Sequence, residues 1–183
     1  VAPYPASLLK LMVAVGVGLA VDAGRVGFDD AWAHGGRTRS VDAWCTDMIV
    51  VSGNDATSAM VALLHAHGML GGARPALHDA FATRGLHTLR LDGTRPDGGW
   101  GNADGAGVGR IQMTAWDTVR LLWLLDPLAT AAPWTGAAPL LSDGARARVI
   151  GWLRGQQLHH VLGLPADVDF AHKTGTTENY GSD

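Results

Sequence analysis

The sequence predicts an α/β (α+β) domain in which helices dominate and one strand stands near the end of the chain. Three observations support this fold class: several apolar segments begin at capping residues, a β-like stretch follows them, and the length suits one domain. The chain has 183 residues, of which 47% are hydrophobic and 17% are charged. It can therefore bury a core, and its composition is not that of a disordered segment.

Three helices are predicted in the first half of the chain. Residues 7–23 are apolar nearly all round, which is typical of a buried central helix. Residues 54–66 form a second helical segment, with an Asn-Asp pair at its start and a glycine after its end. Residues 75–84 follow as a short helix, because proline is favoured in a first helical turn and a glycine stops the segment.

The second half begins with a long loop at residues 92–109, which are rich in Gly and Asp. Thr114 and Asp117 resemble a capping box, and the apolar helix that follows them should end near Pro127. A further helix, capped by a serine, is predicted at residues 142–154.

One strand is predicted at about residues 167–177, with Val168 and Phe170 on the same face. The helical region is expected to occupy about residues 7–165. A lone strand does not make a stable sheet, and the chain ends directly after this strand and a turn. The sequence therefore predicts a single, partial domain over residues 1–183 whose sheet is incomplete.

Charge, cysteine content and hydropathy exclude several functions. The net charge is −3 and the isoelectric point is near 6.2, which argues against nucleic acid or an anionic membrane as the main partner. Cys45 is the only cysteine, so the chain has no internal disulfide and no multi-cysteine zinc site. The longest strongly apolar run, residues 11–21, is too short to span a bilayer.

Two short motifs contain both lysines of the chain. In Ser7-Leu8-Leu9-Lys10, helical spacing brings hydroxyl and amine to one face, and a neutral amine could take the serine proton. Burial and a second cation would both lower the pKa of such a lysine. In Lys173-Thr174-Gly175, on the predicted strand, lysine can hold a carboxylate and glycine admits a ligand close to the backbone. Each motif alone also has an ordinary interpretation. The first could be a capped helix start or part of a signal peptide. The second could be an edge strand protected by a charge.

The joint occurrence of the two motifs is informative because lysine is so rare. With 6 Ser, 13 Thr and 25 Gly in the chain, random composition would produce this pairing roughly once in 3,000 sequences. Ser52-Gly53-Asn54 lies between the motifs, at the start of a predicted helix, where its side chains can reach a cleft.

In this order the three motifs resemble those of the penicillin-recognising serine hydrolases, which include the class A serine β-lactamases and the penicillin-binding DD-peptidases. Residues 5–10 are similar to the class A nucleophile segment, residues 110–125 to the helix after the omega loop, and residues 173–181 to the strand and turn beyond it. The resemblance implies a β-lactamase/transpeptidase-like fold. It also implies a serine hydrolase or acyl-transferase that acts through an acyl-serine intermediate on β-lactams or related amides.

The resemblance also implies a role for each matching residue. Ser7 would be the acylated nucleophile, Lys10 its base, and Ser52 the group that passes a proton to the leaving nitrogen. The substrate-binding residues would be Asn54 for the amide side chain, Lys173 and Thr174 for the carboxylate, and Gly175 and Thr176 along the strand, with the oxyanion hole formed by the backbone N–H groups of Ser7 and Thr176.

No cofactor or metal is implied. The expected partner is a small-molecule β-lactam or a peptidoglycan stem peptide, in an extracytoplasmic (periplasmic or secreted) location. No signal peptide is evident in this segment, and the oligomeric state stays open.

The sequence departs from the class A pattern in the predicted omega loop. Class A enzymes use a Glu there to activate the water that clears the acyl-enzyme, but residues 94–102 contain no Glu, and Glu178 follows the strand. Asp97 is a possible deacylation base or an ordinary turn aspartate. The alternatives are therefore a DD-peptidase-type penicillin-binding protein, a module that binds penicillin or cell-wall fragments without turnover, or a structural remnant.

Four further side chains have simpler interpretations. Some class A enzymes have a disulfide at the positions of Cys45 and Ala14, so that bridge cannot form here and Cys45 is expected to be a buried thiol. His65 and His67 stand two apart on a predicted helix and face different ways, which disfavours a zinc site. Trp100, in the long loop, could line a pocket.

Overall fold

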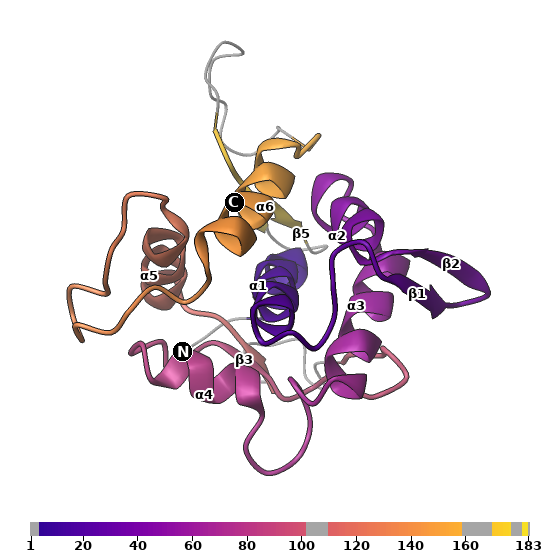
Figure 1. Ribbon diagram of the computed structural model, residues 1–183, viewed down its shortest axis with the longest axis horizontal. Helices are drawn as coiled ribbons and strands as arrows, with labels where there is room; N and C mark the ends of the chain where they lie inside the picture. The colour runs from indigo at the N-terminus through magenta and orange to yellow at the C-terminus, as the bar shows by residue number, and fades with distance from the viewer. Residues whose placement is uncertain (1–3, 102–109, 159–169, 177–180, 183) are drawn as a thin grey trace.

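Helices packed around one apolar helix form most of the regular secondary structure in the described residues. A 3-10 turn, η1 (Ala6–Leu8), leads into α1 (Leu9–Asp22), which Figure 1 shows at the centre of the other helices. The predicted central helix at residues 7–23 is therefore confirmed. The computed structural model describes residues 4–101, 110–158, 170–176 and 181–182.

Three of the helices around α1 begin at capping side chains. Thr114 and Ser142 accept hydrogen bonds from backbone N–H groups three residues further on, as the sequence predicted, and Ser40 does the same. Within the described residues the helices around α1 are α2 (Val41–Val50), α3 (Asn54–Ala66), α4 (Ala76–Ala82), α5 (Ala115–Leu125) and α6 (Asp143–Arg154). Neither α3 nor α4 has a side-chain cap, so the Asn-Asp pair at the start of α3 does not cap it as the sequence predicted.

The core is built on α1, whose residues are almost all buried and which contacts α2, α3 and α6. Its two glycines allow this close packing. A Cβ at Gly16 would lie 2.9 Å from Leu64 Cδ1, and a Cβ at Gly18 would lie 3.1 Å from both Cδ atoms of Leu141. Within the described part of the chain, none of the helices combines the length and the apolar composition that a membrane span requires.

The segment between α1 and α3 contains a hairpin and a helix that the sequence analysis did not predict. Strands β1 (Ala31–His34) and β2 (Arg37–Ser40) are joined by Gly35-Gly36, whose φ angles of 55° and 75° suit a two-residue type I′ turn. The sequence contained a signal for each element. The Gly-Gly pair indicates the turn, and apolar residues at helical spacing indicate α2, where they are buried: Val41, Trp44, Cys45, Met48 and Ile49.

The remaining strands are short antiparallel pairs. Strand β3 (Arg90–Leu91) pairs with β4 (Ile111–Gln112), and β5 (Gly175–Thr176) pairs with β6 (Gly181–Ser182). Residues 92–101 form the expected loop, which an isolated β-bridge between Thr94 and Trp100 closes on itself.

The predicted strand at residues 167–177 is wrong in its extent. Residues 170–174 are in no ladder, and only Gly175 and Thr176 pair. The ring of Phe170 packs on His172 with a centroid distance of 4.5 Å. Val168 and the rest of residues 159–169, together with residue 177, lie outside the described residues. Strand pairing depends on a partner segment, which a local pattern does not contain.

Candidate active site

Ser7 lies at the start of the central helix, directly after a strained residue. Ala6 has a φ of 49°, a left-handed conformation that is uncommon for a residue with a Cβ atom. The Leu8 N–H donates to the Pro5 carbonyl over 3.0 Å and closes the turn. Ser7 is half-buried in this turn. Such strain costs about 1–3 kcal/mol and clusters at functional sites, where the surrounding fold imposes it.

The amine of Lys10 is surrounded by oxygen atoms. Nζ lies 3.0 Å from Oγ of Ser7 and 3.0 Å from Oγ of Ser52. It donates to the Ser52 carbonyl over 2.6 Å and to Oδ1 of Asn54 over 2.8 Å. These last two oxygens can only accept, so they take two N–H bonds in either charge state of the amine. The remaining position on nitrogen is an N–H in the charged form and a lone pair in the neutral form, and it faces the two hydroxyls.

The surroundings of Lys10 favour the neutral amine. Burial removes solvation from the charge, and the Lys173 cation adds repulsion, which together lower the pKa of Lys10 from 10.5 to about 7. Near pH 7 about half of the molecules then have the lone pair, whereas fewer than about one in a thousand ordinary lysines do. The hydroxyl and the amine of the Ser-x-x-Lys motif therefore meet in a form that can exchange a proton.

The turn between α2 and α3 brings Ser52 and Asn54 to this amine. Ser52 has a φ of 59°, and among the described non-glycine residues only Ser52 and Ala6 have positive φ. Both lie at this site, so the backbone strain of the described structure is concentrated here. The Gly53 N–H donates to the Asp47 carbonyl over 3.0 Å, which fixes the turn to the end of α2.

The Lys-Thr-Gly segment lies against η1. Lys173 is only 4% exposed, and its Nζ donates to Oγ of Ser52 over 3.0 Å and to the Thr174 carbonyl over 2.7 Å. The Ser52 hydroxyl is thus in contact with both lysine nitrogens. A Cβ at Gly175 would lie 2.9 Å from the Pro5 carbonyl oxygen. The glycine therefore lets β5 approach the turn that contains Ser7.

A cavity of about 190 Å³ opens beside Ser7. Trp100 lines it, which agrees with the expectation for this loop residue. Three lining residues that the sequence analysis missed lie within three positions of Ser7, and that proximity was the available signal. The full lining is Ser7, Lys10, Asn54 and Thr176 from the predicted site, with Tyr4, Ala6, Leu9 and Trp100.

The arrangement of serine, lysine, Ser-x-Asn and Lys-Thr-Gly agrees with a comparison of the whole sequence. Residues 2–183 match the family described as the β-lactamase enzyme family. The chain belongs to that family. The predicted relationship to the penicillin-recognising serine hydrolases is confirmed, and the β-lactamase family is a family of hydrolases.

Solved β-lactamases share the fold of this chain. The class A β-lactamase of the last common ancestor of Gram-negative bacteria is 25% identical, with a TM-score of 0.67 over 97% of this chain and 67% of its own. A β-lactamase from Xanthomonas campestris pv. campestris is 22% identical, with a TM-score of 0.67 over 95% and 64%. One from Burkholderia vietnamiensis is 21% identical, with a TM-score of 0.64 over 94% and 63%.

The β-lactamase-like α/β fold with an incomplete sheet is thus confirmed. The chain spans 63–67% of the length of these three structures. No curated protein matches the chain in sequence.

The loop of this β-lactamase-family chain places Asp97 in a turn of its own. Its carboxylate accepts the Gly99 N–H over 2.8 Å and lies 3.5 Å from Nε of Arg95. The Gly99 N–H, together with Arg95, holds the pKa of Asp97 below its ordinary value, and the side chain is 69% exposed. Asp97 does not line the Ser7 cavity, and none of the described residues that line it is Asp or Glu. These contacts are those of a turn aspartate.

The other chemically active side chains lie away from this cavity. Cys45 is fully buried, and burial, with a smaller contribution from Asp42, raises the pKa of its thiol well above the ordinary value. Nε2 of His65 contacts Oγ1 of Thr94 over 3.1 Å. The part of the chain that the structure describes contains no group of three side chains suited to holding a metal ion.

Proposed function

We propose that this chain contains the nucleophile and the substrate-recognition segments of a serine hydrolase that forms an acyl-serine intermediate with β-lactams or related amides. The observation that carries the proposal is the 3.0 Å contact between Nζ of Lys10 and Oγ of Ser7, at a site where the pKa of the lysine is about 7. A serine hydroxyl is a weak nucleophile until a base takes its proton. A neutral amine at this distance can take that proton while Oγ attacks the carbonyl carbon.

Ser52 supports the return of the proton. Its hydroxyl lies 3.0 Å from Nζ of Lys10 and 3.0 Å from Nζ of Lys173, so it can accept a proton from Lys10 while passing its own onward. In the complete step the Oγ–carbon bond of Ser7 forms and the carbon–nitrogen bond breaks. The Ser7 proton passes to Lys10, Lys10 gives a proton to Ser52, and Ser52 gives its own proton to the leaving nitrogen.

The remaining site residues would orient the substrate. Lys173, with Thr174, would hold a carboxylate, and Asn54 would bond the amide side chain. The close approach of Gly175 to η1 supports an oxyanion hole made by the backbone N–H groups of Ser7 and Thr176, because it brings that strand beside the nucleophile.

The cavity beside Ser7 has a mixed lining that suits a polar ligand with an aromatic group. Polar groups come from Ser7, Lys10, Asn54 and Thr176, while Tyr4 and Trp100 add aromatic rings. A β-lactam with an aromatic amide side chain has both kinds of group. A peptidoglycan stem peptide as natural substrate, and the extracytoplasmic location that it requires, stay predictions.

A second candidate function, penicillin binding without efficient turnover, is favoured by one observation. Clearing the acyl group needs a base within hydrogen-bond reach of a water molecule. No carboxylate stands among the described residues that line the cavity, and Asp97 is engaged with Gly99 and exposed. We infer that acylation is faster than deacylation, as in a penicillin-binding protein.

Intact-protein mass spectrometry tests the acylation directly. With excess penicillin, the wild type should gain one penicilloyl mass and Ser7→Ala should gain none. The matched control is Ser58→Ala, which removes a hydroxyl from α3 outside the cavity and should be labelled like the wild type. An adduct on the Ser7→Ala protein would contradict the assignment of the nucleophile.

A further inference from the structure

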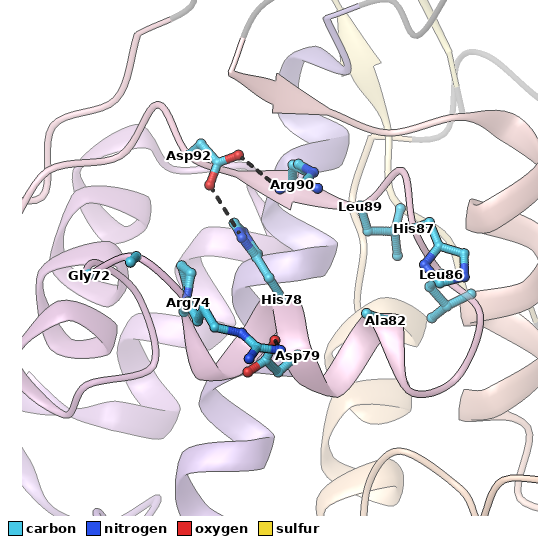
Figure 2. Close-up of a pocket in the computed structure, with 12 residues that line it drawn as sticks. Gly72, Arg74, His78, Asp79, Ala82, Leu86, His87, Leu89, Arg90 and Asp92 are labelled. Carbon is cyan, nitrogen blue, oxygen red and sulfur yellow. Dashed lines mark ion pairs between the residues drawn. The ribbon is translucent and has the colours of Figure 1, made fainter.

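A second cavity, of about 250 Å³, lies at the base of the loop that contains Trp100. It is formed by α4 and the segments on either side of it, and it shares no lining residue with the Ser7 cavity. Figure 2 shows His78 extending from α4 toward Asp92, which also pairs with Arg90. The side chain of His78 is 10% exposed. A nearly buried imidazole therefore stands where β3 passes into the loop.

The hydrogen bonds of His78 define its charge. The Leu91 N–H donates to Nε2 over 3.0 Å, so Nε2 holds a lone pair and the proton of the neutral ring is on Nδ1. Nδ1 lies 3.3 Å from Oδ1 of Asp92, without the alignment of a hydrogen bond, and has no hydrogen-bond partner among the described residues. The contact that holds β3 is thus available only to the neutral imidazole.

A series of contacts joins this histidine to the Ser7 cavity. The carbonyl of Leu91 accepts both the backbone N–H of Thr94, over 3.2 Å, and its hydroxyl, over 2.8 Å. Thr94 forms the β-bridge with Trp100, whose side chain lines the cavity beside Ser7. The segment that His78 holds is therefore the one that supports the cavity wall.

His65 holds the same loop in a different way. Because the Thr94 hydroxyl donates to the Leu91 carbonyl, it accepts from Nε2–H of His65. Neutral and charged imidazole can both donate from Nε2, so protonation of His65 keeps the donor of this hydrogen bond. Burial lowers the pKa of His65, with Asp97 acting in the opposite direction, so its protonation also has a cost in the folded chain. Protonation of His78 would instead set its Nε2–H against the Leu91 N–H, and both groups are donors.

We propose that His78 is a positioning residue that holds the loop, and with it the Trp100 wall of the active-site cavity, only while its imidazole is neutral. Protonation should loosen the loop and change access to Ser7. The claim about the cavity wall rests on the proposed acylation of Ser7. The claim about the loop does not.

The charges around the ring set the direction of the pH dependence. Burial lowers the pKa of His78 below its ordinary 6.5, and Arg90 acts in the same direction, while the carboxylates of Asp92 and Asp79 oppose them. The unfolded chain therefore binds this proton more readily than the folded one. The contribution of the neutral ring is present above pH 6.5 and is lost as the pH falls below it. Arg74 and His87 line the same cavity.

Amide hydrogen exchange of residues 91–101 tests the loop claim without any need for activity. His78→Phe keeps a ring but leaves the Leu91 N–H unpaired, and it should accelerate exchange in this segment about tenfold at pH 7.5. His78→Gln offers an amide oxygen at similar reach and should restore protection. His87→Gln, which changes an exposed histidine of the same cavity, is the matched control and should match the wild type.

The pH dependence separates positioning from simple packing. Between pH 7.5 and 5.5, with intrinsic exchange rates divided out, the wild type and His87→Gln should lose loop protection, while His78→Gln should lose clearly less, its remaining loss coming from His65. The ratio of the His78→Gln acylation rate to the wild-type rate should rise over the same interval, because the titration of Lys10 is common to both and cancels.

Two exchange results would overturn the proposal. In the first, His78→Gln loses as much loop protection as the wild type when the pH falls from 7.5 to 5.5. This comparison can be made even if His78→Phe fails to fold. The other concerns amide exchange in His78→Phe. If exchange is not faster in the loop, or is accelerated as much in α1 and α6 as in the loop, the substitution has no specific effect on the loop. If exchange behaves as expected and no variant is acylated, the positioning of the loop is supported and the proposed function fails.

Discussion

Lys10 and His78 are both buried bases with lowered pKa values, and their surroundings give them different roles. Nζ of Lys10 faces four uncharged oxygens and a second cation, so its lone pair is directed at hydroxyl groups. The lone pair of His78 already accepts the Leu91 N–H, and its ring proton faces a carboxylate. A lowered pKa thus indicates a reactive base only where the lone pair meets a group that can give up a proton.

The largest effect should come from removing the base itself. Lys10→Met should slow the acylation of Ser7 by about 10²–10⁴-fold, because the hydroxyl loses its proton acceptor. His78→Gln, measured at pH 7.5 in the same quenched mass-spectrometry assay, should leave the rate close to wild type. Equal losses in the two variants would remove the distinction between a reactive and a positioning base.

A similarly large effect is expected in clearance of the acyl-enzyme. Without a positioned general base, deacylation should be slower by about 10²–10⁴-fold than with one, so the adduct should persist after free penicillin is removed. The adduct mass, followed over time, measures this. Asp97→Asn should not change it, since Asp97 is engaged in its own turn. Clearance within seconds would contradict the prediction, and its disappearance in Asp97→Asn would make Asp97 the base.

Lys173 should show a smaller, two-part effect. Lys173→Ala should weaken substrate capture roughly ten- to a hundredfold, as expected for a hydrogen bond to a charged group.

The second part of the effect concerns the pH profile. Wild-type acylation should rise with pH through about 7 as Lys10 loses its proton. Without the neighbouring cation the pKa of Lys10 rises, so the midpoint in Lys173→Ala should move to higher pH, whereas Lys173→Arg should keep it. An unchanged dependence on penicillin concentration would rule out the carboxylate-binding role.

The smallest effect should come from the contact between β5 and η1. Gly175→Ala places a methyl group 2.9 Å from the Pro5 carbonyl oxygen and should lower the free energy of unfolding by about 1–3 kcal/mol. Gly151→Ala, in α6 with open space around it, should instead raise it by about 0.5–1 kcal/mol. Denaturant titration of both variants measures the difference. Equal stabilities would show that β5 does not press against the nucleophile turn.

Sequence reasoning succeeded where the determinants are local. The apolar helix at residues 7–23 and the capped helices after Thr114 and Ser142 are present because their spacing and caps act within a few residues. It was wrong about the extent of the strand at 167–177, because residues 170–174 have no strand partner among the described residues and only Gly175 and Thr176 pair. The β1–β2 hairpin and α2 were overlooked, although Gly35-Gly36 and the spacing of the apolar residues indicated them.

The sequence by itself determined that Ser7 and Lys10 share a helix face, because their spacing is a local property, and it placed the chain among the penicillin-recognising serine hydrolases. Only the tertiary structure decided how the site is assembled. Lys10 meets Ser52 and Asn54 across 42 and 44 positions, and Lys173 meets Ser52 across 121. Burial and the distances between such remote segments also determine three further features. These are the pKa of about 7 for Lys10, the position of Trp100 in the cavity wall, and the contact by which His78 holds the loop. No local pattern of residues contains those distances.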